Sequence, residues 1–185
     1  MSDLFEDKNI SPMLLYETQP FDDENYIYEL KLDGIRCLAY IDSKSVVLQN
    51  KRHKDVTVIY PELSQMSKCV RRRVILDGEL VVLNKDGKPD FYALQRRSLM
   101  ADSFKISLAA KSNPVQFVAY DIIYHNGEDL TEKPLMERKS ILSKAVREGN
   151  NLTISRHIER NGVAFFGLAK AQELEGIVAK RKDGL

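Results

Sequence analysis

The sequence predicts an α+β fold with mainly antiparallel sheets and flanking helices. Three observations predict it: several short segments alternate apolar and polar residues, short polar turns join neighbouring segments, and other segments carry apolar residues at helical spacing. The 185 residues are 43% hydrophobic and 30% charged, an ordinary composition for a globular chain with one core. We therefore treat residues 1–185 as one domain.

The first predicted strand covers residues 26–30 and leads into Lys31. Successive side chains alternate across a strand, so Ile27, Glu29 and Lys31 share one face. Asp33-Gly34 is a turn signal, after which the alternation resumes. Further strands are expected from alternation or from β-branched residues over 35–41, 45–49, 74–83, 115–124, 152–158 and 176–180.

Helical spacing predicts helices in the second half of the chain. Apolar residues recur at helical intervals within residues 91–100. Pro134 fits the first turn of a helix through Val146, with Gly149 as a stop. Asn161 fits the N-cap of a helix through Leu174.

Several classes of protein are excluded by composition. No apolar run approaches the roughly 20 residues of a membrane helix, and residues 1–12 lack the apolar region of a signal peptide. The two cysteines, Cys37 and Cys69, do not suggest a disulfide framework, so a reducing cytoplasm is expected. The three histidines show no zinc-ligand spacing with cysteine.

Charge is balanced overall but clustered locally. The formal net charge is +1, yet basic runs occur at 51–54, 71–73, 96–97 and 180–182. Phosphate binding needs one basic face and not a basic average. Each run is also compatible with ordinary solvated surface charge.

The segment from Glu29 to Arg36 has the strongest chemical character. It reads as a strand, a tight turn and a second strand, with Lys31 at the rim. A lysine amine attacks an electrophile only when it is neutral, and Arg36 could hold a phosphate or ribose beside it. The alternative is an exposed hairpin with a salt-bridged lysine.

The whole chain from about Ser11 onward resembles the ATP-dependent DNA ligases, within the covalent nucleotidyltransferase superfamily that includes RNA ligases and mRNA capping enzymes. Four stretches resemble its motifs I, III, IIIa and IV in order: Lys-Leu-Asp-Gly-Ile-Arg (31–36), Asp-Gly-Glu (77–79), Phe-Val-Ala-Tyr-Asp (117–121) and Glu-Gly-Ile-Val-Ala-Lys (175–180). Three further stretches favour DNA ligases: 55–63, 91–97 and 126–139. The resemblance implies a DNA ligase/mRNA capping enzyme nucleotidyltransferase-like fold.

The resemblance also implies a role for each matched residue. Lys31 would attack the α-phosphate of ATP and hold AMP covalently. Glu29 would accept a hydrogen bond from the adenine amino group, with Leu30 beside it in the nucleotide-contacting strand. Tyr120 would stack on adenine. A surface glutamate and a core tyrosine are the respective alternatives for Glu29 and Tyr120.

The remaining matched residues concern the sugar, the phosphates and a metal. Arg36 would contact the sugar or the phosphates, and Glu79 the ribose hydroxyl, unless Glu79 pairs with a basic neighbour. Glu175, with Glu79, would help to bind Mg²⁺, which takes few carboxylates plus phosphate oxygens and water. Lys180 would face the phosphates, or would be a solvated strand end.

Two departures from the family pattern matter. Lys51 stands where the family usually has arginine, with Arg52 next to it, so either residue could meet the phosphate. Motif V is absent, and its paired lysines and an oligonucleotide-binding domain are expected beyond Leu185. A domain truncated there should adenylate slowly, because those lysines would stabilise the transferring phosphate.

The resemblance therefore implies the adenylation domain of an ATP-dependent DNA ligase. It would use ATP, held as covalent AMP, with Mg²⁺, and would act as a cytoplasmic monomer on nicked double-stranded DNA, with no membrane. An RNA ligase, or a nucleotide- or nick-binding module that is inactive as truncated, are the alternatives.

Overall fold

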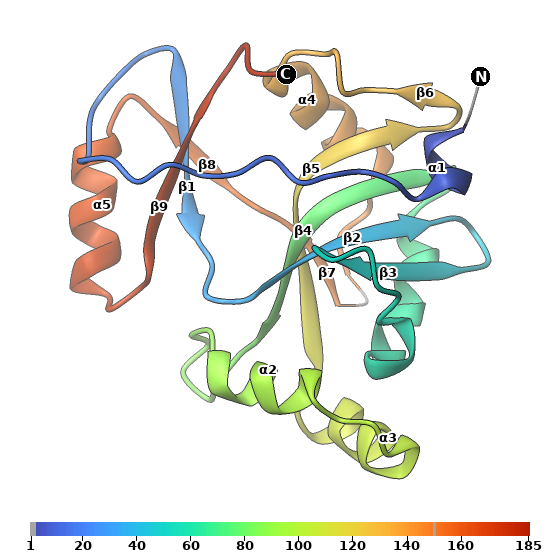
Figure 1. Ribbon diagram of the computed structural model, residues 1–185. Coiled ribbons are helices and arrows are strands. Elements are labelled where there is room, and N and C mark those ends of the chain that lie inside the picture. The colour runs from blue at the N-terminus through green and yellow to red at the C-terminus, as the bar shows by residue number, and fades with distance from the viewer. Residues whose placement is uncertain (1–2, 150) are drawn as a thin grey trace.

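Two sheets organise the chain, and the computed structural model describes them over residues 3–149 and 151–185. The smaller sheet has the strand order β8-β1-β9, with β1 at Tyr26–Lys31, β8 at His157–Glu159 and β9 at Gly176–Arg181. Both of its pairings are antiparallel. Figure 1 shows this sheet on the left, with α5 (Gly162–Ala171) against its outer side.

The larger sheet has the order β3-β2-β4-β5-β6, and β7 pairs with β5. All its pairings are antiparallel except that of β5 with β7. The predicted α+β class with mainly antiparallel sheets is confirmed. The strands are β2 (Ile35–Ile41), β3 (Val46–Asn50), β4 (Val74–Val82), β5 (Val115–His125), β6 (Glu128–Asp129) and β7 (Leu152–Ile154).

Helices flank the larger sheet, and the main core lies between them and its strands. α4 packs against β5, while α2 and α3 lie together beyond the end of the sheet (Figure 1). No described helix is long and apolar enough to cross a membrane. The helices are α1 (Leu4–Asp7), α2 (Phe91–Ser98), α3 (Ser103–Ser112) and α4 (Leu135–Ala145), with 3₁₀ segments η1 (Thr57–Ile59) and η2 (Pro61–Cys69).

The link between β1 and β2 carries the chain from one sheet to the other. Gly34 lies in this link, against β4. A Cβ at Gly34 would stand 2.3 Å from the carbonyl oxygen of Leu80 and 2.6 Å from Cγ of Glu79. Glycine is therefore required here by close approach, and it lets the link lie directly on β4 beside Glu79.

The predicted strand over residues 152–158 is wrong as a single element. It is two short strands, β7 in the larger sheet and β8 in the smaller one, separated by Ser155 and Arg156. Alternation continues through both strands, so periodicity could not reveal that the chain changes sheets between them.

Two helix predictions also need correction. α5 ends at Ala171 rather than Leu174, and the side chain of Asn161 makes no capping hydrogen bond. Instead, Val163 N donates to Oδ1 of Asp22 at 2.9 Å, so a residue far away in sequence caps the helix. α3 was not predicted, although Asp102 caps it by accepting from Lys105 N.

Candidate active site

Apart from Lys51 and Arg52, the predicted site residues lie where the two sheets face each other. Lys31 ends β1, and the register of β1 with β9 pairs it with Gly176, the residue after Glu175. Arg36 and Glu79 are register partners on β2 and β4. Tyr120 comes from the middle of β5.

Tyr120 joins the two sheets electrostatically. Lys180 Nζ lies 4.6 Å from the centroid of its ring, and the guanidinium carbon of Arg36 lies 5.8 Å from it. Lys180 belongs to the smaller sheet and Arg36 to the larger one. The ring of Tyr120 is therefore placed among the predicted site residues, and not in the apolar core clusters.

Lys31 is paired with the carboxylate predicted to bind metal. Its side chain is 40% exposed, and Nζ donates to Oε1 of Glu175. The pair is accessible to solvent. A lysine amine in such a pair can act as a nucleophile only after it loses a proton and releases its carboxylate partner.

Glu79 lies in the same electrostatic environment. Burial raises the pKa of Glu79 to about 7; Asp77 and Glu175 act in the same direction, while Arg36 and Lys31 oppose it. Among the described residues Glu79 forms no ion pair. Its neighbours Arg36 and Lys31 pair with Asp77 and Glu175 instead, so the alternative of a Glu79 paired with a basic neighbour is wrong. The carboxyl of Glu79 is thus available to a ligand.

The carboxylates alone do not form a complete metal site. Within residues 3–149 and 151–185, no group of three or more His, Cys, Asp or Glu side chains is arranged to hold an ion. Glu175 and Glu79 nevertheless fit Mg²⁺, which is usually bound through one or two carboxylates while phosphate oxygens and water complete its octahedron.

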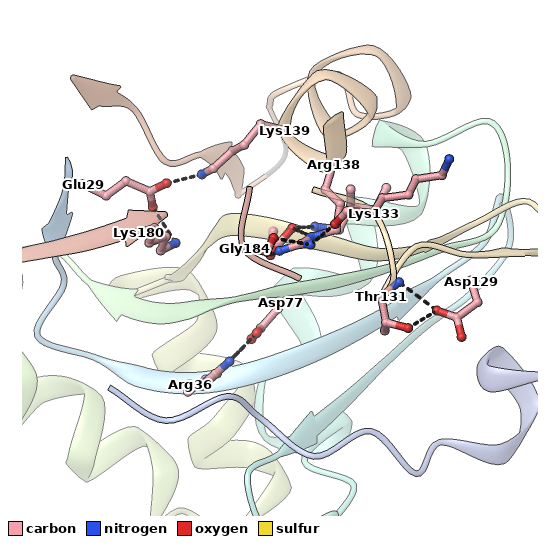
Figure 2. A network of polar contacts seen from close by, with 12 residues as sticks. Glu29, Arg36, Asp77, Asp129, Thr131, Lys133, Arg138, Lys139, Lys180 and Gly184 are labelled. Carbon is pink, nitrogen blue, oxygen red and sulfur yellow. Dashed lines mark hydrogen bonds and ion pairs between the residues drawn. The ribbon is translucent and has the colours of Figure 1, made fainter. Parts of the chain in front are cut away.

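Glu29 is buried in a network of donors (Figure 2). It is 2% exposed, so the alternative of a surface glutamate is wrong. Oε1 accepts from Lys139 Nζ, and Oε2 accepts from Lys180 Nζ and Ser155 Oγ, each at 3.0 Å. Burial opposes ionisation of Glu29, but Lys180 and Lys139 outweigh it and hold its pKa below the usual value.

This network leaves Glu29 able to accept a hydrogen bond from one further donor. An ionised carboxylate has about four acceptor positions, and three donors occupy three of them here. Sequence reasoning missed Lys139 and Ser155. Lys139 ends a stretch that resembles the ligases, but nothing in the sequence says that it reaches Glu29 from 110 residues away.

Arg36 is fixed in place by Asp77, a third residue whose role sequence reasoning missed. Nε donates to Oδ1 of Asp77 at 3.0 Å, Nη2 donates to Oδ2, and Nη1 donates to the carbonyl oxygen of Met13 (Figure 2 shows the contact with Asp77). Asp77 is 6% exposed. A buried fork of this kind orients the guanidinium beside Tyr120.

Lys51 and Arg52 differ in position. Both are exposed in the turn after β3, but Lys51 lines a small pocket together with Arg36, whereas Arg52 does not. The geometry favours Lys51 as the residue nearer the site. Leu30 pairs with Ile177 of β9 and is 36% exposed.

Comparison with known sequences identifies the family. The sequence model described as the ATP dependent DNA ligase domain matches residues 12–185. The chain belongs to this family. The expected resemblance to ATP-dependent DNA ligases is thereby confirmed.

Relatives of the ligase domain include longer proteins. The ligase domain is 36% identical, over 93% of its length, to the SPbeta prophage-derived DNA ligase-like protein LigB of Bacillus subtilis, and it covers 60% of that protein. It is 29% identical over 97% of its length to the multifunctional non-homologous end joining protein LigD of Mycobacterium bovis, of which it covers 22%. The ligase domain thus spans less than two thirds of these relatives.

Solved structures show the same fold. The mycobacterial DNA ligase D complexed with ATP and MES superposes with a TM-score of 0.80 at 28% identity, covering 96% of the ligase domain and 56% of that chain. The ligase domain of Mycobacterium tuberculosis LigD superposes with a TM-score of 0.79 at 27% identity. The predicted nucleotidyltransferase-like fold is confirmed.

Proposed function

We propose that this ligase domain transfers AMP from ATP to Lys31 and then to the 5′-phosphate of nicked double-stranded DNA. The observation that carries the proposal is the convergence of Lys31, Glu175 and Glu79 at the facing edges of two sheets. On this proposal the protein works in the cytoplasm as a monomer.

The base site is formed by Glu29 and Tyr120. The free acceptor position of Glu29 accepts a hydrogen bond from the adenine amino group, and the ring of Tyr120 lies against the purine face. A guanine would present a carbonyl oxygen to the Glu29 carboxylate. Such a mismatch typically costs about 1–3 kcal/mol, so ATP is preferred over GTP.

Transfer to Lys31 replaces one bond to phosphorus by another. The neutral amine forms a P–N bond with the α-phosphate, the bond to the bridging oxygen breaks, and pyrophosphate leaves. Mg²⁺, held by Glu175 and Glu79, would offset phosphate charge. Arg36 and Lys51 supply fixed positive charge near the same phosphates, whereas Lys180, bonded to Glu29 and over the ring of Tyr120, lies beside the base.

Sealing would follow from the same site. The AMP on Lys31 passes to a 5′-phosphate at a nick, and a 3′-hydroxyl then displaces AMP. Paired lysines and an oligonucleotide-binding domain following residue 185 would complete this reaction in a longer protein. The 185 residues alone would then bind ATP but adenylate about a hundredfold to a thousandfold more slowly.

The first experiment maps the covalent bond. The protein is incubated with Mg²⁺ and α-labelled ATP, digested and mapped by mass spectrometry, and the label is expected on Lys31. Lys31→Ala should abolish labelling and leave the fold intact, since a half-exposed lysine contributes little to stability. Lys88→Ala is a matched control, because Lys88 is 39% exposed and also pairs with a glutamate. Label on another lysine, with Lys31 unmodified, would refute the assignment.

A second experiment separates the three candidate activities. Nicked DNA and nicked RNA are offered to the AMP-loaded protein in parallel. Transfer of AMP to the 5′-phosphate of DNA supports the proposal, and transfer to RNA alone supports an RNA ligase. A protein that binds ATP and nicks but never forms lysyl-AMP, even in a longer chain, would be a binding module.

A further inference from the structure

A basic surface lies away from the active site. It is a groove of about 890 Å³ between the end of η2 and the C-terminal end of α4. Its cationic side chains are Lys68, Arg71, Arg72, Lys144 and Arg147, and no aspartate or glutamate is among the residues that line it. We call it the basic groove.

Backbone pairing brings the two halves of the groove together. Val70 and Val146 form an antiparallel bridge, and Arg147 N donates to the carbonyl oxygen of Cys69 at 2.9 Å. Residues about 75 positions apart in sequence are therefore held side by side by backbone hydrogen bonds. The groove is a fixed feature of the fold and not a chance meeting of flexible side chains.

The charges in the groove are uncompensated. None of its five cations forms an ion pair with any described residue, whereas Arg73, next in sequence, pairs with Glu6 at 3.1 Å. Glu148, adjacent to Arg147, accepts instead from Ile154 N and Arg156. Like charges placed together without counter-charges repel, so the arrangement costs stability unless an anion lies in the groove.

The lining indicates what kind of anion fits. Five cations spread along two chain segments suit several successive negative charges better than one small ion. Apart from His125, no ring lines the groove, so there is no platform on which bases could stack. A nucleic-acid backbone, read by charge alone, matches this lining.

The groove lies at the far end of the larger sheet from Lys31. Glu79 is in the active site, and Val74, five residues earlier on β4, is two residues from Arg72. At about 3.4 Å per residue, this separation along β4 is roughly 17 Å. The basic groove is therefore separate from the adenylation site.

We infer that the basic groove binds the phosphate backbone of duplex DNA away from the nick, without reading its sequence. The inference rests on the proposed action on DNA, and it adds a contact outside the adenylation site. Removing charge from the basic groove should lower the affinity for DNA and the salt dependence of binding, and should leave the reaction with ATP unchanged.

The test compares two triple variants on an un-nicked duplex. The variant Arg71→Ala/Arg72→Ala/Lys144→Ala removes groove charge, and the control Lys85→Ala/Lys105→Ala/Lys111→Ala removes the same charge from exposed positions elsewhere. The slope of log Kobs against log salt should fall by about 2.7 in the groove variant, or about 0.9 per lost contact. The control should change it much less. Both variants should form lysyl-AMP at the wild-type rate and melt no lower than wild type.

A footprint supplies an independent readout. Acetylation of Lys68 should be protected by the duplex in the wild-type protein, while Lys111 stays reactive. An unchanged slope in the groove variant, an equal loss in both variants, or an unprotected Lys68 would each overturn the inference and leave an acidic protein as the partner to test. Wild-type protein that forms lysyl-AMP but binds no DNA would instead refute the DNA part of the proposed function.

Discussion

Tyr120 is the residue at which recognition of the base can be tested most directly. The centroid of its ring lies 4.6 Å from Lys180 Nζ. Because Tyr120 lies within strand β5, removing the ring should not disturb the backbone. We expect Tyr120→Ala to weaken ATP binding by about 1–3 kcal/mol, the usual value of a base–aromatic stack. Tyr120→Phe keeps the ring and loses only the hydroxyl contact with Asp77, so its affinity should stay close to wild type. Calorimetric titration of both variants measures this, and a Tyr120→Ala protein with unchanged affinity would contradict it.

Glu79 gives the ligase domain a distinctive dependence of stability on pH. Its pKa is about 7 in the folded state because of burial, against 4.5 for a free carboxyl. The folded state then holds this proton more tightly, so the free energy of unfolding should decrease as pH rises from about 4.5 to 7, by at most about 3 kcal/mol. Above about pH 8, where Glu79 is ionised in both the folded and the unfolded state, the contribution is constant.

The variant Glu79→Gln isolates this effect from other titrating groups. It cannot ionise, so the difference in unfolding free energy between variant and wild type should grow in the variant's favour from pH 5 to pH 8. Urea denaturation at several pH values without nucleotide measures the difference. A difference that does not change with pH would show that Glu79 titrates normally.

At the scale of elements, the link between β1 and β2 sets the position of Lys31. Gly34→Ala would place a Cβ 2.3 Å from the Leu80 carbonyl oxygen, and the backbone of Leu80 cannot move far because β4 is paired with β2. We expect the free energy of unfolding to fall by about 1–3 kcal/mol, a value typical of overpacking. We also expect slower lysyl-AMP formation, because Lys31 shifts relative to Glu79. Gly167→Ala is the matched control: its Cβ meets nothing within 4 Å, and alanine in a helix should be neutral or stabilising. Thermal melts and single-turnover labelling test both, and a Gly34→Ala protein as stable and active as wild type would refute the argument.

The elements that sequence reasoning predicted correctly are those with strong local patterns. β1, β2 and β5 alternate and β4 is rich in β-branched residues on both sides of Asp-Gly-Glu (77–79), so their existence follows from local pattern. The split between β7 and β8 and the capping of α5 by Asp22 could not be predicted, because both depend on contacts between distant segments. For the same reason, Lys31, Glu29 and Tyr120 could be selected from motifs, whereas the contacts that Asp77, Lys139 and Ser155 make with site residues could not be predicted.

At the scale of the whole molecule, the sheets meet across a polar network rather than an apolar one. Glu29 belongs to the smaller sheet, Lys139 to the helix beside the larger one, and Ser155 to the connection between the sheets. The segment after α1 also crosses both sheets, bonding to Arg36 through Met13 and to α5 through Asp22 (Figure 1). Replacing a buried ion pair by apolar residues is often neutral or stabilising, so a network of this kind needs a reason beyond stability.

On the proposed function, nucleotide recognition is that reason, and a pair of variants separates recognition from stability. Lys139→Met leaves Glu29 buried with one cation fewer. We expect the free energy of unfolding to fall by about 3 kcal/mol, at the low end of the range for a broken buried ion pair. The loss is at the low end because Lys180 and Ser155 still donate to Glu29. The double variant Glu29→Met/Lys139→Met removes both buried charges and should recover most of that stability. It should nevertheless lose the preference for ATP over GTP, because no carboxylate remains to accept from the adenine amino group. Urea denaturation and competition between labelled ATP and GTP measure the two effects, and a double variant that recovers stability and still discriminates ATP from GTP would show that Glu29 serves only the fold.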